Sequence, residues 1–146
     1  MPIWQVCGWW GEDMPQEKNG ITLSEEKDQY DQPVANVHFD DHENDIAMRN
    51  HAYKQGKALY DSVGATNTYP TPPYPSTHNL GTNRMSEKPE DGVVNGFGQS
   101  HDIKNLFVSD GSQFTTGGAE NPTLTIVTLA IRQADYIEEQ MKAKAI

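Results

Sequence analysis

The sequence predicts an α/β fold of short strands and two long helices. Residues 34–39 alternate apolar and polar side chains, as a strand with one covered face does. Residues 41–63 and 122–142 instead repeat apolar side chains at helical spacing. Four prolines between positions 70 and 75 exclude a helix or a central strand at that point. We therefore expect an extended connector between an amino-terminal and a carboxyl-terminal region.

The first forty residues predict short strands joined by polar turns. Val6 and the neighbouring tryptophans suit a half-buried strand. Residues 17–20 form the first turn signal, because Asn19-Gly20 favours the left-handed conformations of a tight hairpin. Residues 21–23 then predict a strand, and a second polar turn over residues 28–33 leads into the alternating strand.

The helix predicted from residue 41 to residue 63 has signals for both of its ends. Asp41 or Asp45 suits the amino-terminal cap, because a short carboxylate accepts hydrogen bonds from the amides of the first turn. Gly64 suits the carboxyl-terminal end, where a left-handed residue usually stops a helix. The apolar positions are Ile46, Ala52, Tyr53, Leu59, Tyr60 and Val63.

After the connector at residues 66–76, the sequence predicts two short strands and a final helix. The strands are Val93-Val94 and Leu106-Phe107-Val108, and the second is apolar enough to be buried. In the helix, Asn121 suits the cap and Pro122 the first helical position. Its apolar stripe consists of Leu124, Val127, Ile131, Ala134 and Met141, widened by Ile126, Ala130 and Ile137. We divide the chain into residues 1–75 and 76–146.

Composition narrows the classes of function. The 146 residues carry a formal net charge of −10, which repels nucleic acid, so no DNA or RNA partner is expected. Cys7 is the single cysteine, which excludes an internal disulfide and suits a packed small residue. No run approaches the roughly 20 apolar residues of a membrane span, so direct membrane insertion is not expected. No signal peptide is visible, and the sequence leaves cytoplasm and periplasm both open.

The predicted strand, turn and helix from Leu106 to Lys142 suit the binding of an anionic group. Glycine in Asp110-Gly111-Ser112 lets a phosphate approach the backbone closely. The final helix directs the positive end of its dipole toward whatever precedes it. The same residues also suit an ordinary strand, turn and helix, in which Asn121 is only a cap.

His78 and Asn121 suit the oxidation of an alcohol. This reaction must remove the hydroxyl proton, which a histidine can take near neutral pH. A neutral amide beside the histidine can donate to the developing alkoxide without competing for the proton. His78 also suits a surface position, and the sequence by itself shows no proximity between the two residues.

Four motifs follow one another in the second half of the chain. They are His78 with Gly81-Thr82-Asn83-Arg84-Met85, then Gly92-Val93-Val94, then Asn105-Leu106-Phe107-Val108 with Asp110-Gly111-Ser112, and last Asn121-Pro122-Thr123-Leu124-Thr125. In this order they resemble the carboxyl-terminal part of the glucose-methanol-choline (GMC) family of FAD-dependent oxidoreductases, over roughly residues 76–140. Residues 1–75 resemble the family's substrate domain more loosely.

The resemblance implies a fold, a cofactor and residue roles. Residues 1–75 would be the end of an α+β substrate domain, and residues 76–146 the catalytic loop with the strand and helix that return into a Rossmann-like FAD domain. His78 would take the hydroxyl proton while hydride passes to flavin N5, and Asn121 would hold the substrate oxygen. The residues in contact with FAD would be Asp110, Gly111, Pro122 and Thr123. The substrate would be an alcohol, sugar or polyol, oxidised by a dehydrogenase or oxidase of bacterial type.

One part of the family pattern is absent from the sequence. The family binds the ADP half of FAD with a strand, a Gly-x-Gly-x-x-Gly turn and a helix. Gly96-Phe97-Gly98 is followed by His101 and by no helix, so it predicts only a turn. The expected partner is an amino-terminal FAD-binding part, without which this chain should be inactive. The alternative is a non-catalytic module that binds a partner or a small ligand.

A few further residues have two interpretations. Trp4, Trp9 and Trp10 suit the lining of a sugar pocket, although packing is the more frequent role of such residues. His38 and His42 do not predict a metal site, because His38 falls in a predicted strand. We expect Arg84 to make a structural contact, and His51 and His101 to lie at the surface.

Overall fold

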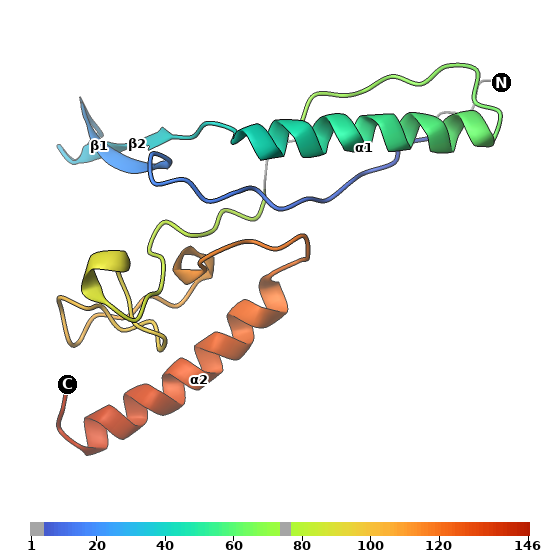
Figure 1. Ribbon diagram of the computed structural model, residues 1–146. Helices are drawn as coiled ribbons and strands as arrows, with labels where there is room; N and C mark the ends of the chain where they lie inside the picture. Colours follow the sequence, from blue (N-terminus) through green and yellow to red (C-terminus); the bar gives the residue numbers. More distant parts are fainter. Residues whose placement is uncertain (1–4, 74–76) are drawn as a thin grey trace.

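The computed structural model describes residues 5–73 and 77–146 and confirms a small mixed fold of strands and helices. Trp4 and the last part of the predicted connector lie outside these residues. Figure 1 shows the two long helices, α1 and α2, on opposite sides of the molecule. The elements are β1 (Gly20–Lys27), β2 (Pro33–His38), α1 (Glu43–Ser62), the short 3₁₀ helices η1 (Pro89–Asp91) and η2 (Gly111–Gln113), and α2 (Thr123–Lys142).

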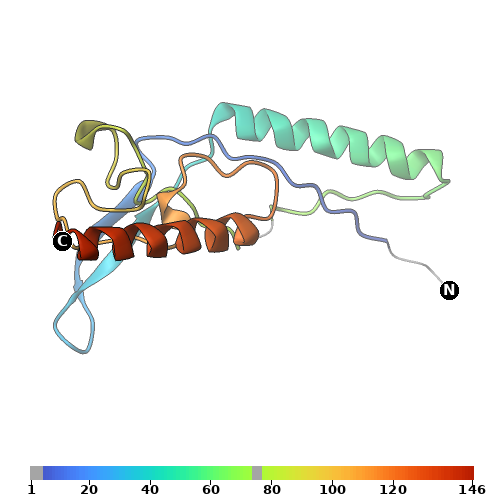
Figure 2. The ribbon, with the colours of Figure 1, turned by 90° about the horizontal axis from the view of Figure 1, so that it is seen from below.

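Residues 5–16 form no strand, contrary to the prediction. Within the described residues the sheet holds only β1 and β2, so this segment has no strand beside it to complete a ladder. Val6 and Cys7 are exposed, and the expected packing of the cysteine is therefore wrong. The segment instead runs beside α1, as Figures 1 and 2 both show.

β1 and β2 form an antiparallel hairpin that confirms both predicted strands but moves the hairpin turn. The turn is the second polar segment, where the Asp28 carboxylate accepts the Tyr30 amide at 2.8 Å and Asp31 adopts a φ of 62°. The Asn19-Gly20 pair lies at the open end of the hairpin. There the Asn19 side chain accepts the Asp40 amide at 2.9 Å and donates to the Asp40 carbonyl at 3.0 Å. Asn19 therefore ties the two strand ends together instead of reversing the chain.

The ends of α1 are fixed by a capping box and by a glycine. His42, not Asp41, is the amino-terminal cap, and its own amide donates to Asp45 at 3.0 Å. Asp45 lies in the first turn and is buried. Its carboxylate also accepts the Met14 amide at 3.1 Å. The prediction for the other end is confirmed, since Gly64 follows the helix with a φ of 79°.

The Asp13 carboxyl lies near this capping box. Loss of solvent around the carboxyl raises its pKa, and the negative charges of Asp45 and Asp41 raise it further. The guanidinium of Arg49, which is paired with Asp41, acts in the opposite direction. The start of α1 therefore gathers the acidic side chains of two chain segments.

α2 begins one residue later than predicted, and Asn121 is not its cap. Pro122 occupies the cap position and already has helical angles, with φ −84° and ψ −9°. Its carbonyl accepts the Ile126 amide at 2.9 Å. Because the proline itself starts the helical conformation, the Asn121 side chain stands outside the helix and makes no capping hydrogen bond.

The packed face of α2 differs from the predicted apolar stripe. Leu124, Val127, Ile131 and Met141 are exposed. The half-buried positions include Ile126, Ala130 and Ile137, which the sequence had placed at the margin of the stripe. The described part of the chain therefore covers only one side of α2 and leaves its most apolar side open.

A buried glutamine holds α2 to the preceding loops. Gln133 is 5% exposed, and its amide nitrogen donates to the carbonyls of Phe97 and Val108 at 2.9 and 2.8 Å. Beside it, the ring of Phe97 stacks on Tyr136 with 4.2 Å between the centroids. The guanidinium of Arg132 lies 4.5 Å above the same ring.

The two strands predicted between the connector and α2 are reduced to isolated bridges. Val94 pairs singly with Met85 and Ser100, and Phe107 pairs singly with Gln99. Leu106 is 49% exposed, so the expectation of a buried strand is wrong. The reason is that no further strand among the described residues extends either bridge into a ladder.

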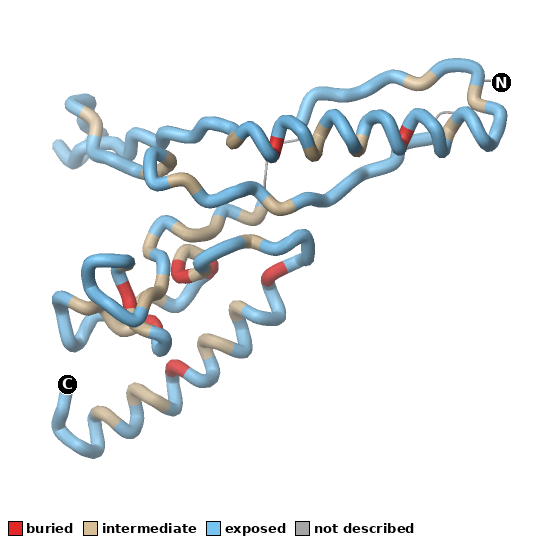
Figure 3. The backbone as a smooth tube through the Cα atoms, in the orientation of Figure 1, coloured by how far each residue is buried: buried red, intermediate tan, exposed pale blue. Residues whose placement is uncertain are grey.

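Most of the described residues are exposed to solvent (Figure 3), and many of them carry large apolar side chains. The described chain exposes 11668 Å², whereas a compact monomer of its 16.3 kDa would expose about 7,500 Å². Among the described residues only Val94 is a buried hydrophobic side chain. Such a surface is typical of a part that packs against more protein. None of the helices among the described residues is long and apolar enough to cross a bilayer. The predicted boundary between residues 1–75 and 76–146 stays a prediction.

Replacing Gln133 by glutamate tests the role of its amide. The change keeps the shape of the side chain but removes the nitrogen that donates to the two carbonyls. We expect a loss of roughly 3 kcal/mol in the free energy of unfolding, because two part-buried acceptors lose their donor and the buried side chain becomes a carboxyl group. Urea unfolding measures this loss. The matched control is Gln55→Glu in the middle of α1, where the side chain is exposed; equal losses for the two variants would contradict the assigned role.

Candidate functional site

The loop that follows His78 runs alongside η2. Three backbone hydrogen bonds connect them, donated by the amide of every second residue of the loop. Gly81 donates to the Gly111 carbonyl at 3.4 Å, Asn83 to the Ser112 carbonyl at 2.9 Å, and Met85 to the Gln113 carbonyl at 2.9 Å. The Asn83 side chain adds a bond to the Ser112 hydroxyl at 3.1 Å. The Gly-Thr-Asn-Arg-Met motif and the Asp-Gly-Ser motif, far apart in sequence, are thus paired through their backbones.

Gly111 is the point where this loop, η2 and the first turn of α2 meet. The residue is buried, and a Cβ atom built on it would lie 2.5 Å from Leu80 Cδ2 and 3.3 Å from Ile126 Cδ1. Gly117 is also close to Leu80, at 3.4 Å from an equivalent Cβ. The segments that carry His78 and Asn121 therefore converge around Leu80, while the contact between the two side chains stays a prediction.

The two predicted catalytic residues differ in their surroundings. His78 is half-buried, and its ring stacks with the indole of Trp10 at 5.9 Å between centroids and 24° between planes. Asn121 is exposed on the loop before α2. In that loop the Gly118 amide donates to the Glu12 carboxylate at 3.2 Å. Residues 5–16 therefore contact the loops of both predicted catalytic residues. The only sign of this role in the sequence is the cluster of tryptophans near its start.

The four residues predicted to contact FAD lie on η2 and at the start of α2. Asp110 caps η2, and its Oδ1 accepts the Ser112 amide at 2.8 Å and the Ser112 hydroxyl. These bonds hold the pKa of Asp110 below its ordinary value of 3.8. Gly111 and Pro122 are buried, and Thr123 is exposed.

The first turn of α2 lacks a side-chain cap among the described residues. Pro122 occupies the cap position and makes no such hydrogen bond. The amides of a first helical turn have no partner inside the helix, and the helix dipole adds about half a positive charge at the same end. This end of α2 therefore provides a set of donors suited to a negatively charged group.

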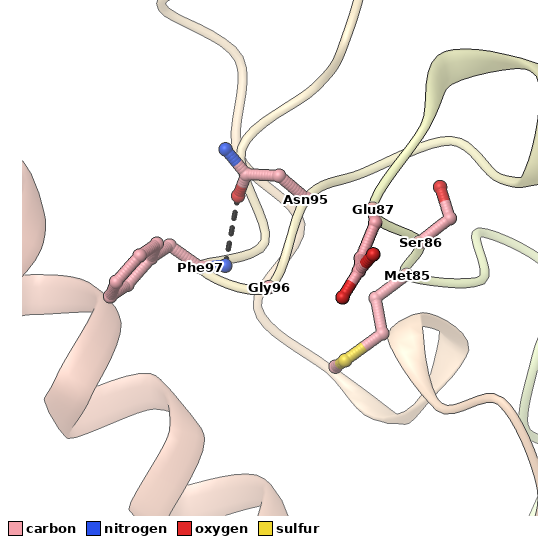
Figure 4. Close-up of a pocket in the computed structure, with 6 residues that line it drawn as sticks. All are labelled: Met85, Ser86, Glu87, Asn95, Gly96 and Phe97. Carbon is pink, nitrogen blue, oxygen red and sulfur yellow. Dashed lines mark hydrogen bonds between the residues drawn. The ribbon is translucent and has the colours of Figure 1, made fainter.

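One open pocket lies away from these residues. Figure 4 shows its lining residues on two loops. The pocket has a volume of about 430 Å³. It is lined by Met85, Ser86, Glu87, Asn95, Gly96 and Phe97. In its wall the side-chain oxygen Oδ1 of Asn95 accepts the Phe97 amide at 2.8 Å. None of the predicted site residues lines it, so it is not the predicted catalytic site.

The remaining polar candidates have structural contacts. Arg84 donates to the Asp91 carbonyl at 2.6 Å, as expected of a structural residue. His101 is half-buried, contrary to the expected surface position, and its Nε2 lies 3.0 Å from Ser86 Oγ. Because that hydroxyl donates to the Lys88 carbonyl at 2.7 Å, it accepts from His101 and is not activated as a nucleophile. Within residues 5–73 and 77–146 no group of three or more metal-ligating side chains is found.

Known proteins similar to this chain belong to the same family that the sequence motifs resemble. The model for the carboxyl-terminal part of the family described as GMC oxidoreductase matches residues 15–130. A 2-methyl-1,2-propanediol dehydrogenase of Mycolicibacterium austroafricanum is 46% identical over 134 residues, covering 89% of this chain and 24% of the relative. The fructose dehydrogenase large subunit of Gluconobacter japonicus is 32% identical over 134 residues, covering 88% and 24%. A C-glycoside 3-oxidase of Arthrobacter globiformis is 32% identical over 119 residues, covering 78% and 23%.

These matches place the chain in the class of the oxidoreductases. The chain belongs to the GMC oxidoreductase family, whose members are generally flavoproteins. It spans about a quarter of the length of these three relatives.

Replacing Asp110 by alanine tests the cap of η2. Since the folded-state pKa lies below 3.8, the ionised carboxylate stabilises the fold above that pH and loses this contribution as the pH falls through the lower, folded-state pKa. We expect Asp110→Ala to cost about 0.5 to 1 kcal/mol at pH 7, a small value because the group is exposed. Urea unfolding at pH 7 and pH 3 should show that the difference from wild type shrinks in acid. Asp102→Ala, on an exposed turn, is the control; a pH-independent difference for Asp110→Ala would contradict the assignment.

Proposed function

We propose that this chain carries the catalytic residues of a flavin-dependent enzyme that oxidises CH–OH groups of an alcohol, sugar or polyol. Its membership of the GMC family supports the class of reaction. The named relatives, a diol dehydrogenase, a fructose dehydrogenase and a glycoside oxidase, support a hydroxylated donor. The observation that carries the proposal is the convergence of the His78 loop, η2 and the first turn of α2 at Gly111.

FAD is the cofactor that we assign to this site. The uncapped first turn of α2 fits the group, because its amides and dipole favour negative charge where a reduced flavin ring carries it. Asp110, Gly111, Pro122 and Thr123 would be the residues that hold FAD. When bound, FAD supplies an acceptor for the hydride of the substrate carbon.

His78 is the base in this proposal. Its imidazole takes the proton of the substrate hydroxyl, which makes the departure of hydride from the carbinol carbon easier. Asn121 orients the same oxygen through its amide and, being uncharged, does not compete for the proton. The exposed position of Asn121 outside the helix leaves its carboxamide available for this role, because the helix does not use it as a cap.

An amino-terminal FAD-binding part is the partner that we propose for this chain. The glycine fingerprint that binds the ADP half of FAD is absent from the sequence. The large open apolar surface supports a further packed part. Co-expression with such a part should give a yellow protein with a flavin spectrum. A folded but colourless complex would instead favour the non-catalytic module.

The catalytic roles are tested by His78→Ala and Asn121→Ala in the full-length, flavin-loaded protein. We expect His78→Ala to slow flavin reduction by a factor of about 10² to 10⁴, as for the loss of a general base. Asn121→Ala should slow reduction by a smaller factor of about 10 to 10², because it removes one hydrogen bond to the reacting oxygen. Stopped-flow absorbance under anaerobic conditions measures both rates.

The control is His51→Ala, because His51 lies exposed on α1. FAD content, measured from the flavin spectrum after gel filtration, should remain unchanged in all three variants. Reduction of the His78→Ala enzyme at the wild-type rate would remove this residue from the mechanism.

A further inference from the structure

We propose that Trp10 is a positioning residue for His78, whose indole fixes the orientation of the imidazole. The segment from Trp9 to Met14, which we call the strap, in turn fixes the indole. This inference rests on the proposed function of His78 as the base. It adds a residue from the amino-terminal end of the chain to the machinery of the carboxyl-terminal half.

The contact between the two rings has the geometry of a stacked aromatic pair. The centroids are 5.9 Å apart and the planes 24° from parallel, within the range of favourable offset stacking. Stacking restricts rotation of the imidazole plane, which sets the direction of the nitrogen lone pair. A base must aim that lone pair at the hydroxyl proton, and small errors of direction reduce the rate of transfer.

The strap is fixed to α1 through close backbone contacts. Gly56 is buried, and a Cβ atom on it would lie 3.2 Å from Trp9 Nε1, so the missing side chain leaves room for that indole. A Cβ atom on Gly11 would lie 2.5 Å from the sulfur of Met48. Trp9 therefore faces α1 while its neighbour Trp10 faces His78. Figure 2 shows the same course, with the amino-terminal segment beside α1.

Two hydrogen bonds complete the strap. The Met14 amide donates to Asp45 of α1 at 3.1 Å, and the Glu12 carboxylate accepts the Gly118 amide at 3.2 Å. Gly118 lies on the loop that leads to Asn121, so one short segment contacts the loops of both proposed catalytic residues. The strap therefore contacts α1 on one side and, on the other, the loops that carry His78 and Asn121.

Trp10 is well suited to substitution because it is 73% exposed. Its side chain covers little of the fold, so a variant at this position should remain folded. Its contact with His78 is then the main interaction that the substitution removes. A role in positioning affects the rate of the chemical step, whereas a role in holding substrate affects the dissociation constant.

The test uses flavin reduction in the full-length, FAD-loaded protein. We expect Trp10→Leu to slow reduction at saturating substrate by about tenfold, with the substrate dissociation constant changed less than about twofold. Trp10→Phe keeps a stacking ring and should restore most of the rate. Tyr30→Leu is the matched control, since Tyr30 is an aromatic residue with 74% exposure on the hairpin turn.

A double-variant cycle decides whether Trp10 acts through His78. In the His78→Ala protein the further change Trp10→Leu should have no effect, because the residue that it positions is gone. A tenfold loss in both backgrounds would overturn the proposal, as would an effect confined to the substrate dissociation constant. A rate unchanged by Trp10→Leu in the wild-type background would overturn it as well.

A spectroscopic measurement separates this inference from the proposed function. In protein with ¹³C-labelled histidine, the ring-proton signal of His78 is identified by its loss in His78→Ala. Removal of the stacked indole in Trp10→Leu should move this signal downfield, whereas Tyr30→Leu should leave it in place. If His78→Ala proves catalytically silent but the signal moves, the base assignment fails and the contact stands. An unmoved signal overturns the contact itself.

Discussion

Gly111 is buried where the His78 loop, η2 and the first turn of α2 meet, and the missing side chain determines how closely they approach. Leu80 and Ile126 occupy the space that a Cβ atom would need. Three backbone hydrogen bonds join the loop to η2 at the same place. The arrangement gives a local loop region a defined geometry although the described chain has almost no hydrophobic core.

Polar contacts perform much of the work that hydrophobic packing does in a compact domain. Gln133 ties α2 to two carbonyls, Asp45 joins the first turn of α1 to the strap, and Asn19 closes the open end of the hairpin. Such bonds specify geometry more than they add free energy. Apolar side chains of both helices remain exposed, as is typical of a surface that packs against other protein.

Sequence reasoning succeeded where local chemistry dominates and failed where the neighbours decide. Both helices and Gly64 follow from periodicity and from glycine's freedom at a helix end, and the ordered motifs indicated the family before any comparison. The packed face of α2 did not follow, because Gln133 is buried by two distant carbonyls that no periodicity reports. Asn121 was misassigned as a cap because Pro122 itself adopts the capping position. The catalytic pairing of His78 with Asn121 stays a prediction. The stacking of Trp10 with His78 joins segments far apart in the sequence, so no local pattern predicts it.

Asp45 serves two structures with one carboxylate, because its two oxygens accept from His42 within α1 and from Met14 outside it. When the first turn of α1 frays, the strap therefore loses its hydrogen bond to Asp45 at the same time. The frequency of that opening is set by the local stability of one helical turn. Disorder that begins in the first turn of α1 would in this way pass along the strap to the tryptophan stacked on His78.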